Sequence, residues 1–355
     1  MSGSDRETSA ETLERIARAR ERLGDRVLVL GHHYERDDVL RFADRTGDSF
    51  QLAREAAEEK DRPFIVFCGV HFMAETADIL TDDDQAVLLP DLEAGCSLAD
   101  FADAEQVALC WDAFESVRPA RTVPITYVNS TAAIKAFCGE RGGLACTSAN
   151  ALSAFRWALG RGERILFVPD EHLGRNTARS LGIGEEETAV WDPARTGGGV
   201  APDRLAGARV ILWKGRCDVH THFRPEHVDA VRLAHPGIRV MVHPECPAEV
   251  VERADASGST GQIIRAVREG GAGLTWAIGT EWHLVNRLAH AYEDRKVINL
   301  TTEPSVCPTM NRITPKKLLH VLERLLEGEA VNRIVVPAEI ALPARKALDR
   351  MLTLA

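Results

Sequence analysis

The chain has 355 residues, 45% of them hydrophobic and 27% charged, with a formal net charge of −10. This length exceeds what one compact core holds, so we expect about two or three domains. No apolar run reaches the roughly 20 residues of a membrane-spanning helix, and the polar N-terminus lacks a secretion signal, so we expect a cytoplasmic protein. The acidic balance, without any basic block, argues against a nucleic-acid partner.

Short β-branched runs alternate with longer amphipathic stretches from the N-terminus onward. The predicted strands lie, in chain order, at residues 26–30, 63–68, 86–90, 123–129, 164–169, 208–213, 238–243, 274–279 and 296–300. Amphipathic patterns predict helices over residues 49–60 and 315–328. This alternation is typical of parallel sheets covered by helices. In such folds ligands bind where strands end and helices begin.

Three of the predicted strands end in polar residues, and a hydroxyl follows 17 to 19 positions later at a predicted helix start. The three pairs are His32 and Ser49, Asn129 and Ser148, and His243 and Thr260. A helix N-terminus offers free N–H groups and about +0.5 of an elementary charge. Each hydroxyl therefore marks a candidate site for a carboxylate or phosphate, although a simple helix cap is the plainer interpretation of any one alone.

A cysteine follows each of these hydroxyls. The intervals are 47, 69 and 47 residues, and they lead to Cys96, Cys217 and Cys307. We assign the longer middle interval to the charged, glycine-rich segment 182–204, which we interpret as a surface insertion. The pattern predicts three related α/β units, each of which supplies a polar strand end, a hydroxyl and a cysteine to a shared centre.

The three cysteines suggest a metal centre. Three thiolates from distant segments can hold an iron–sulfur cluster and leave one iron without a protein ligand. An open metal position acts as a Lewis acid. Zinc bound by three cysteines and a histidine is the nearest alternative, and a buried thiol is the default for any single cysteine.

Polar groups at the strand ends suggest proton transfer, because histidine titrates near neutrality and a buried carboxyl can serve as an acid or a base. The candidates are His32, Tyr34, Tyr127, His243 and Glu245. Asn129 is suited to orient a carboxylate or a carbonyl. We assign surface or supporting roles to the other histidines, which include His172, His220, His222, His227 and His235.

Several long motifs resemble the quinolinate synthase (NadA) family. They are, in order, "LGHHYERDDV", "FCGVHFMAETADIL", "LLPDLEAGCSLAD", "YVNSTAAIKA", "FVPDEHLGRNTA", "KGRCDVH", "VHPECPAEV" and "VCPTMNRIT". The resemblance runs from about residue 26 to about residue 320. It implies an α/β fold of three pseudo-symmetric three-layer αβα domains, with short parallel sheets around a central iron–sulfur site.

The resemblance also implies domain limits and a cofactor. The implied domains are residues 1–96 with 308–355, residues 97–217 with the insertion 182–204, and residues 218–307. The implied cofactor is a [4Fe–4S] cluster whose ligands are Cys96, Cys217 and Cys307. The family's enzymes condense iminosuccinate with dihydroxyacetone phosphate to give quinolinate, phosphate and water in de novo NAD biosynthesis, and the cluster acts as a Lewis acid.

Site residues carry over from the family by motif. The implied substrate-binding residues are His32, Ser49, Tyr127, Asn129, Ser148, His243, Glu245 and Thr260, and the implied catalytic residues are His32, Tyr34, Tyr127 and Glu245. Because the reaction needs no net redox change, we expect no nicotinamide or flavin. An aspartate oxidase or dehydrogenase is the expected transient partner, because iminosuccinate is short-lived in water.

Some residues depart from the family pattern, and other functions compete. His33 and Glu35 stand where many members have Asn and Gln, and Cys246 is an alternative thiol beside Glu245. The nearest alternative enzyme is another cluster-dependent hydro-lyase that acts on a small polycarboxylate. An iron–sulfur sensor without turnover and a cluster-free metabolite-binding module are the alternatives from other classes.

Overall fold

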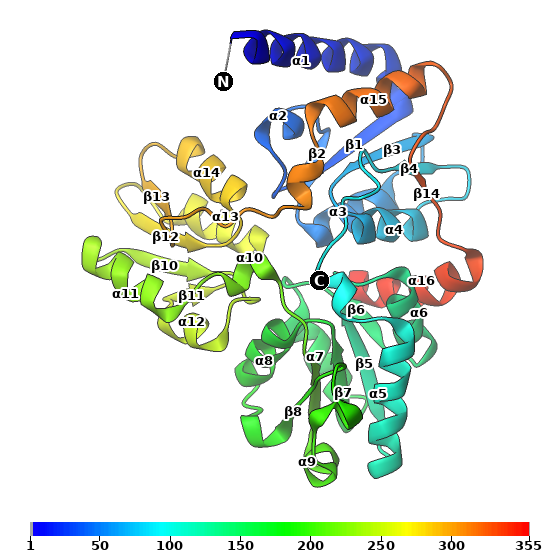
Figure 1. The fold of residues 1–355 in the computed structure, drawn as a ribbon, viewed down its shortest axis with the longest axis vertical. Coiled ribbons are helices and arrows are strands. Elements are labelled where there is room, and N and C mark those ends of the chain that lie inside the picture. Colours follow the sequence, from blue (N-terminus) through cyan, green and yellow to red (C-terminus); the bar gives the residue numbers. More distant parts are fainter. Residues whose placement is uncertain (1–2, 355) are drawn as a thin grey trace. The chain divides into compact units, whose positions relative to one another are not determined.

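The computed structural model describes the backbone of residues 3–354 and the side chains of residues 10–354. The chain divides into two compact units. The first unit comprises Met1–Cys96 with Val306–Val336, and the second comprises Ser97–Ser305 with Pro337–Ala355. Both units are built from sheets flanked by helices (Figure 1). No helix in the described part of the chain combines the length and the apolar character needed to cross a bilayer.

The first unit contains one five-stranded sheet, in the order β14-β4-β3-β1-β2. Its strands are β1 (Val27–His32), β2 (Arg45–Gly47), β3 (Phe64–Cys68), β4 (Ala86–Leu88) and β14 (Arg333–Ile334). Its α-helices are α1 (Gly3–Leu23), α2 (Asp37–Leu40), α3 (Ser49–Glu58), α4 (His71–Leu80) and α15 (Pro315–Leu326). All strand pairs are parallel except β14 with β4. Every residue of β1 is buried, which explains its continuous apolar run, because a central parallel strand is covered on both faces.

The second unit contains two parallel sheets, in the orders β6-β5-β7-β9-β8 and β11-β10-β12-β13. The five-stranded sheet consists of β5 (Thr122–Tyr127), β6 (Leu144–Cys146), β7 (Arg164–Val168), β8 (Thr188–Trp191) and β9 (Val210–Trp213). The four-stranded sheet consists of β10 (Arg239–Val242), β11 (Ala256–Ser257), β12 (Thr275–Gly279) and β13 (Lys296–Asn299). The α-helices are α5 (Ala104–Val117), α6 (Ala132–Glu140), α7 (Ala151–Leu159), α8 (Glu171–Ser180), α9 (Pro202–Gly207), α10 (Asp218–Thr221), α11 (Pro225–Ala234), α12 (Ala248–Arg253), α13 (Thr260–Glu269), α14 (Trp282–Ala291) and α16 (Ala338–Thr353).

One strand order occurs in all three sheets. In each, the first strand pairs with a short second strand on one side and with the third strand on the other, and a fourth strand follows the third. The repeated orders are β2-β1-β3-β4, β6-β5-β7-β9 and β11-β10-β12-β13. Two sheets add one outer strand, β14 or β8. This shared topology agrees with the three related α/β units that the sequence spacing predicts.

The α/β fold class and the nine predicted strands are confirmed, and so are the helices over 49–60 and 315–328, which form α3 and α15. The strands that sequence patterns did not predict are β2, β6, β8, β11 and β14. Each of these has only two to four residues. Runs this short carry too little periodicity to be distinguished from a loop.

The interpretation of segment 182–204 as a plain surface insertion is wrong in part. Its residues Thr188–Trp191 form β8, which pairs in parallel with β9 and is the outer strand of the five-stranded sheet. Trp191 is buried, and Gly198, at φ 66°, packs against its ring so closely that a Cβ would lie 2.2 Å from Trp191 Cδ2. The sequence did not predict this four-residue strand, because the glutamates and glycines on either side of it are typical of loops.

The C-terminal helix α16 packs on α6 and β6 of the second unit. The sequence grouping of residues 308–355 placed it in the first domain instead. Gly139 of α6 permits the close contact, because a Cβ there would lie 1.8 Å from the carbonyl oxygen of Pro343. The Asn150 side chain also donates a hydrogen bond to the carbonyl oxygen of Met351, at 3.1 Å. The chain therefore returns to the second unit after β14.

Candidate active site

Two of the three predicted hydroxyls, Ser49 and Thr260, do not cap their helices, because the residue before each of them does. Asp48 caps α3 and accepts hydrogen bonds from Phe50 N and Gln51 N, both at 3.0 Å. Ser259 likewise caps α13 in a reciprocal capping box with Gln262. Ser49 and Thr260 are thus the first helical residues.

The third hydroxyl stands in a related turn that leads into α7. Thr147 N donates to Asn150 Oδ1 at 2.8 Å, and Thr147 Oγ1 accepts from Ala149 N at 3.3 Å. Ser148 follows Thr147 and is half-buried. Asn150, which precedes α7, makes no side-chain cap hydrogen bond. Ser148 lies three residues before the first residue of α7, so the plainer interpretation as a cap is wrong for Ser148 as well as for Ser49 and Thr260.

Within the second unit, Ser148, His243 and Glu245 form a hydrogen-bonded chain. His243 Nε2 lies 3.2 Å from Ser148 Oγ, and His243 Nδ1 lies 3.0 Å from Glu245 Oε2. His243 and Glu245 are both buried, with 2% of each residue exposed. A hydroxyl, an imidazole and a carboxylate in this order can activate the hydroxyl or move a proton to and from a bound substrate.

His220 joins this group, although sequence reasoning gave it only a surface or supporting role. It is 1% exposed, and its ring stacks on that of His243 with centroids 4.2 Å apart. Its Nδ1 lies 2.8 Å from Glu245 Oε2, and its Nε2 lies 3.1 Å from Thr280 Oγ1. The signal available in the sequence was its position three residues after Cys217, which puts both residues on one side of the short helix α10.

Two buried carboxyl groups in this region have opposite pKa shifts. Burial acts to raise the pKa of Glu245, but His220 and His243 outweigh it, so its pKa lies below the ordinary value. Burial and then the charge of Glu245 raise the pKa of Asp170 well above its ordinary value. Asp170 Oδ1 accepts from Leu173 N, whereas the buried Oδ2 has no hydrogen-bond partner in the part of the chain that the structure describes. The surroundings therefore favour the ionised form of Glu245 and the neutral acid form of Asp170.

The five-stranded sheet of the second unit supplies Tyr127 and Asn129. Tyr127 ends β5 and is 5% exposed, and its carbonyl oxygen accepts hydrogen bonds from Ser130 Oγ and Thr126 Oγ1. Among the described residues, the buried Oδ1 of Asn129 has no hydrogen-bond partner. An unpaired buried acceptor is costly, so this oxygen is suited to a donor on a bound molecule.

The first unit places His32, Tyr34 and Ser49 at the carboxyl end of its sheet. His32 ends β1 beside Gly47 of β2, and it is 4% exposed. Its Nδ1 accepts a hydrogen bond from Tyr34 N at 3.1 Å, and the Tyr34 ring meets the imidazole edge-on at 4.7 Å. In neutral His32 the proton is therefore on Nε2, which makes this imidazole a hydrogen-bond donor.

Exposure separates the eight cysteines into two groups. Cys96, Cys217 and Cys307, the predicted ligands, are the half-buried ones. The others are fully buried, and burial raises the pKa of each of their thiols; they are Cys68, Cys110, Cys138, Cys146 and Cys246. Metal ligation requires a thiolate that can reach the metal, so the donor chemistry fits the predicted set and disfavours Cys246.

One further ligand set occurs within the second unit. Donor atoms of Cys217, His220 and Glu245 all lie within 4.8 Å of one another. A thiolate, an imidazole and a carboxylate suit zinc as well as iron. The described geometry of this set therefore does not by itself select one metal.

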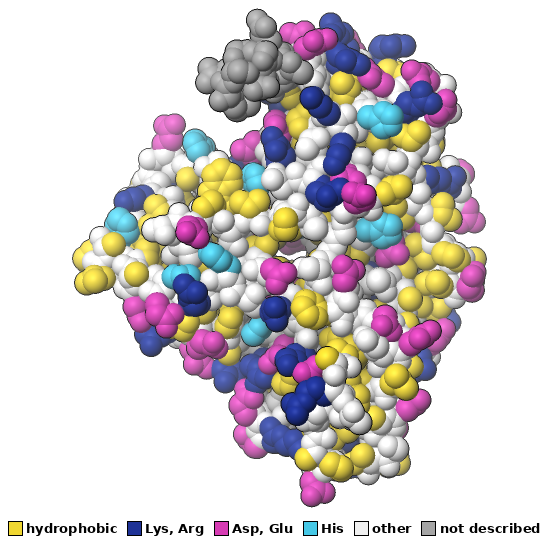
Figure 2. All heavy atoms as spheres, viewed as in Figure 1, with side chains coloured by type: hydrophobic (Ala, Val, Ile, Leu, Met, Phe, Trp, Pro, Cys, Tyr) yellow, Lys and Arg dark blue, Asp and Glu magenta, His cyan; other side chains and the backbone are white. Residues whose placement is uncertain are grey.

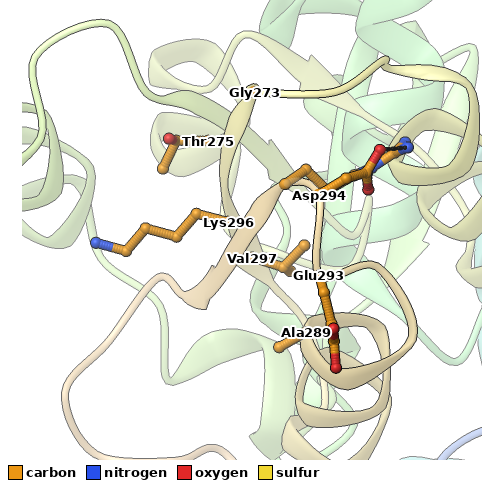
Figure 3. Close-up of a pocket in the computed structure, with 8 residues that line it drawn as sticks. Gly273, Thr275, Ala289, Glu293, Asp294, Lys296 and Val297 are labelled. Carbon is orange, nitrogen blue, oxygen red and sulfur yellow. Dashed lines mark hydrogen bonds and ion pairs between the residues drawn. The ribbon is translucent and has the colours of Figure 1, made fainter.

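A cavity also lies at the amino ends of the strands in the four-stranded sheet, away from the candidate site residues. A cavity of about 560 Å³ lies at the amino ends of β12 and β13, between Gly273, Thr275 and Lys296 (Figure 3). Figure 3 shows the Lys296 and Glu293 side chains pointing away from one another. Since ligands of parallel sheets bind at the carboxyl ends of strands, this cavity is not part of the candidate site.

The surface drawn in Figure 2 interleaves basic and acidic side chains. Among the described residues, ion pairs of such groups include Arg179 with Glu252 and Arg253 with Asp229.

Comparisons with known proteins agree on one family. Residues 14–353 match the family model described as "NadA: Quinolinate synthetase A protein". A protein named quinolinate synthase from Acidobacterium capsulatum is 57% identical over 343 residues, which cover 96% of this chain and 92% of that protein. Proteins of the same name from Geobacillus kaustophilus and Streptomyces coelicolor are 54% and 53% identical; each alignment covers 97% of this chain, and 94% and 88% of the respective relative.

Proposed function

We propose that this chain, which belongs to the quinolinate synthase family, condenses iminosuccinate with dihydroxyacetone phosphate at the site described above. The chain is an enzyme, and its activity is quinolinate synthesis in NAD biosynthesis. The products of the proposed reaction are quinolinate, phosphate and water. The observation that carries the site assignment is the hydrogen-bonded chain of Ser148, His243 and Glu245 at the carboxyl end of a parallel sheet.

The proposed cofactor is a [4Fe–4S] cluster held by Cys96, Cys217 and Cys307. The support is that these three thiols are half-buried, whereas the other five are fully buried. When bound, such a cluster supplies a Lewis-acidic iron that polarises hydroxyl or carboxylate oxygen. We also propose that each ligand comes from one of three domains, which correspond to the three repeated sheets.

The substrates are anionic, and the chain has a net charge of −10, so local groups must bind them. Iminosuccinate brings two carboxylates, and the triose brings one phosphate. Ser49 and Thr260, the first residues of α3 and α13, can bind such groups through their hydroxyls and their own backbone N–H groups. Asn129 Oδ1 is suited to accept a hydrogen bond from the imine nitrogen or from a substrate hydroxyl.

The two histidines have different parts in the proposed proton transfers. His243 Nδ1 faces the ionised Glu245, so its Nε2 is the basic nitrogen and can take a proton through Ser148 or directly from the substrate. Glu245 then stabilises the imidazolium, and His220 holds the carboxylate from its other side. His32 Nε2–H and the Tyr34 hydroxyl donate protons to oxygens that leave as water.

Another enzyme must make iminosuccinate and supply it to this enzyme, because the imine hydrolyses quickly. We propose an aspartate oxidase or dehydrogenase as that transient partner, and the cytoplasm as the shared compartment. Reducing conditions there would preserve a cluster with an open iron.

The test is anaerobic purification, followed by measurement of iron, sulfide and quinolinate formation. Wild type should bind about four irons and form quinolinate only when both substrates are present. Cys96→Ala, Cys217→Ala and Cys307→Ala should each lose the cluster, whereas Cys110→Ala and Cys246→Ala should keep it. Iron retained in Cys307→Ala, or zinc in place of iron after reconstitution, would contradict the cofactor assignment. Turnover of a polycarboxylate without the triose would favour the alternative hydro-lyase.

A further inference from the structure

Asn176 of α8 makes two hydrogen bonds to the turn that carries Glu245. Its Nδ2 lies 2.9 Å from the carbonyl oxygen of Pro244 and 2.9 Å from that of Cys246. Both protons of one side-chain amide are therefore donated to the carbonyl groups on either side of Glu245. Asn176 is 9% exposed. Asparagine is less favourable than alanine in a helix interior, so its presence here is explained by these bonds and not by helix propensity.

These bonds connect the two sheets of the second unit. Helix α8 packs on β7 and β9 of the five-stranded sheet. The turn of residues 243–246, called here the 243–246 turn, directly follows β10 of the four-stranded sheet. Ser148 precedes α7, which packs on the same five-stranded sheet as α8. The Ser148–His243 contact therefore joins groups from different sheets, and its length depends on how the sheets are held together.

Within itself, the 243–246 turn has few hydrogen bonds that fix it. Cys246 N donates to His243 O at 3.0 Å, and Glu245 N lies 3.4 Å from His243 Nδ1. Both of these bonds move with the turn and cannot set its position relative to Ser148. The Asn176 amide, together with the packing of α12 on α8, ties the turn to a helix that packs on α7, the helix that Ser148 precedes.

We propose that Asn176 is a positioning residue, which holds the 243–246 turn against α8 and so sets the hydrogen-bonding distance between Ser148 and His243. This inference rests on the proposed roles of Ser148, His243 and Glu245. Asn176 contacts no substrate in the proposal and acts through the turn alone. Loss of its two donors lets the turn shift, and a shift of about 1 Å can cost on the order of 100-fold in rate.

A groove beside Asn176 makes the proposal testable by chemical rescue. It has a volume of about 330 Å³, and all of its lining side chains are uncharged; they include Leu152, Thr177 and Gln262 as well as Asn176 itself. A small neutral amide can enter such a groove when the Asn176 side chain is shortened. Acetamide carries the same NH₂ group and can donate to both carbonyl oxygens.

The experiment compares quinolinate formation by cluster-loaded wild type, Asn176→Ala, Asn176→Leu and Asn176→Asp, each with and without acetamide. We expect kcat to fall about tenfold or more in every variant, with KM changed less than threefold, because proton transfer is affected and not anion binding. Acetamide should restore part of kcat in Asn176→Ala, whose groove is enlarged. It should not restore Asn176→Leu, whose side chain fills the space.

Ser180→Ala is the matched control, because Ser180 lines the same groove and its hydroxyl donates a hydrogen bond to the Asn176 carbonyl oxygen, away from the 243–246 turn. It should keep wild-type kcat with or without acetamide. Wild-type kcat in Asn176→Leu would overturn the proposal. So would a loss in Asn176→Ala that follows a lowered melting temperature and does not respond to acetamide. A wild type that forms no quinolinate would instead contradict the proposed function.

Discussion

The turns that carry His32 and His243 have the same backbone arrangement, but only His243 has a carboxylate, that of Glu245, beside its Nδ1. Each histidine follows the first strand of its sheet, and each ring Nδ1 is approached by the backbone N–H two residues later, at 3.1 Å from Tyr34 and 3.4 Å from Glu245. A helix whose preceding residue forms a capping box begins 17 positions after each. The repeat therefore delivers equivalent imidazoles to the carboxyl ends of two sheets.

The residue two positions later decides what each imidazole can do. Glu245 Oε2 lies 3.0 Å from His243 Nδ1, closer than the backbone N–H, so that nitrogen carries the proton and Nε2 is basic. Tyr34 offers no carboxylate, so His32 Nδ1 accepts from the backbone and its Nε2 carries the proton. One backbone design thus gives a base in the second unit and a hydrogen-bond donor in the first.

Glu245→Gln should remove this difference and have the largest effect. The amide NH₂ can donate to His243 Nδ1 and force the proton onto Nε2, the tautomer of His32. We expect kcat for quinolinate formation to fall roughly 10³- to 10⁴-fold, as for other imidazoles held in the wrong tautomer. Iron content should stay at the wild-type level. More than a tenth of wild-type activity in a fully loaded variant would show that His243 is not the base.

Tyr34→Phe tests the other side of the comparison. The phenyl ring keeps the edge contact with His32, which has a centroid distance of 4.7 Å, and removes only the hydroxyl. If Tyr34 protonates a leaving oxygen, kcat should fall about 100-fold, whereas KM should change little. A comparable rise in KM with unchanged kcat would make Tyr34 a binding residue instead. Single-turnover measurements separate the two outcomes.

Asp170→Asn tests the pair of buried carboxyl groups, Asp170 and Glu245, in the region of His243. The pKa of Asp170 is raised in the folded protein, so the wild type loses stability as pH rises from about 3.9, the unfolded value, towards the folded pKa. The neutral amide avoids this loss and keeps the Oδ1 that accepts from Leu173 N. The variant should therefore gain up to about 1.4 kcal/mol over wild type for each pH unit in that window.

Urea unfolding at several pH values between 4 and 7 checks this prediction. The difference between Asp170→Asn and wild type should be small at the acid end and grow with pH. The contribution of Glu245 to stability changes with pH in the opposite direction, because the pKa of Glu245 is lowered in the folded protein. Its contribution is complete above about 4.3, the unfolded value, and is lost below it. A difference that shrinks as pH rises would show that Asp170 is ionised in the folded protein.

The sequence was sufficient for the main strands, the repeat and the three half-buried cysteines, because long β-branched runs and regular intervals depend on local pattern. It was insufficient where a contact lies between distant segments. The sequence predicted a surface or supporting role for His220, whereas in the structure its ring lies against Glu245. Asn176 gave no signal, because it binds backbone carbonyl groups, which every residue has.

In segment 182–204, local composition suggested a loop where a contact with a distant strand forms a sheet. Its glycines and glutamates favoured a surface loop, and only pairing with β9 reveals that residues Thr188–Trp191 extend the sheet. Ser49 and Thr260 begin helices as predicted, whereas Ser148 lies three residues before α7. The plainer interpretation of these hydroxyls as helix caps is wrong. Asp48 and Ser259 precede Ser49 and Thr260 directly, and sequence spacing cannot resolve which of two adjacent polar residues caps a helix.

Paired substitutions at the two helix starts separate these roles and carry the smallest expected effects. Ser49→Ala and Thr260→Val should raise KM roughly tenfold, since hydrogen bonds to charged groups contribute about 1.5–3 kcal/mol, and should leave stability nearly unchanged. Asp48→Ala and Ser259→Ala should instead lower the free energy of unfolding by about 1 kcal/mol. Urea midpoints and KM values for each substrate measure both. If the cap variants raise KM as much as the hydroxyl variants do, the helix start and not the hydroxyl binds the anion, and the two helix starts then act through their backbone alone.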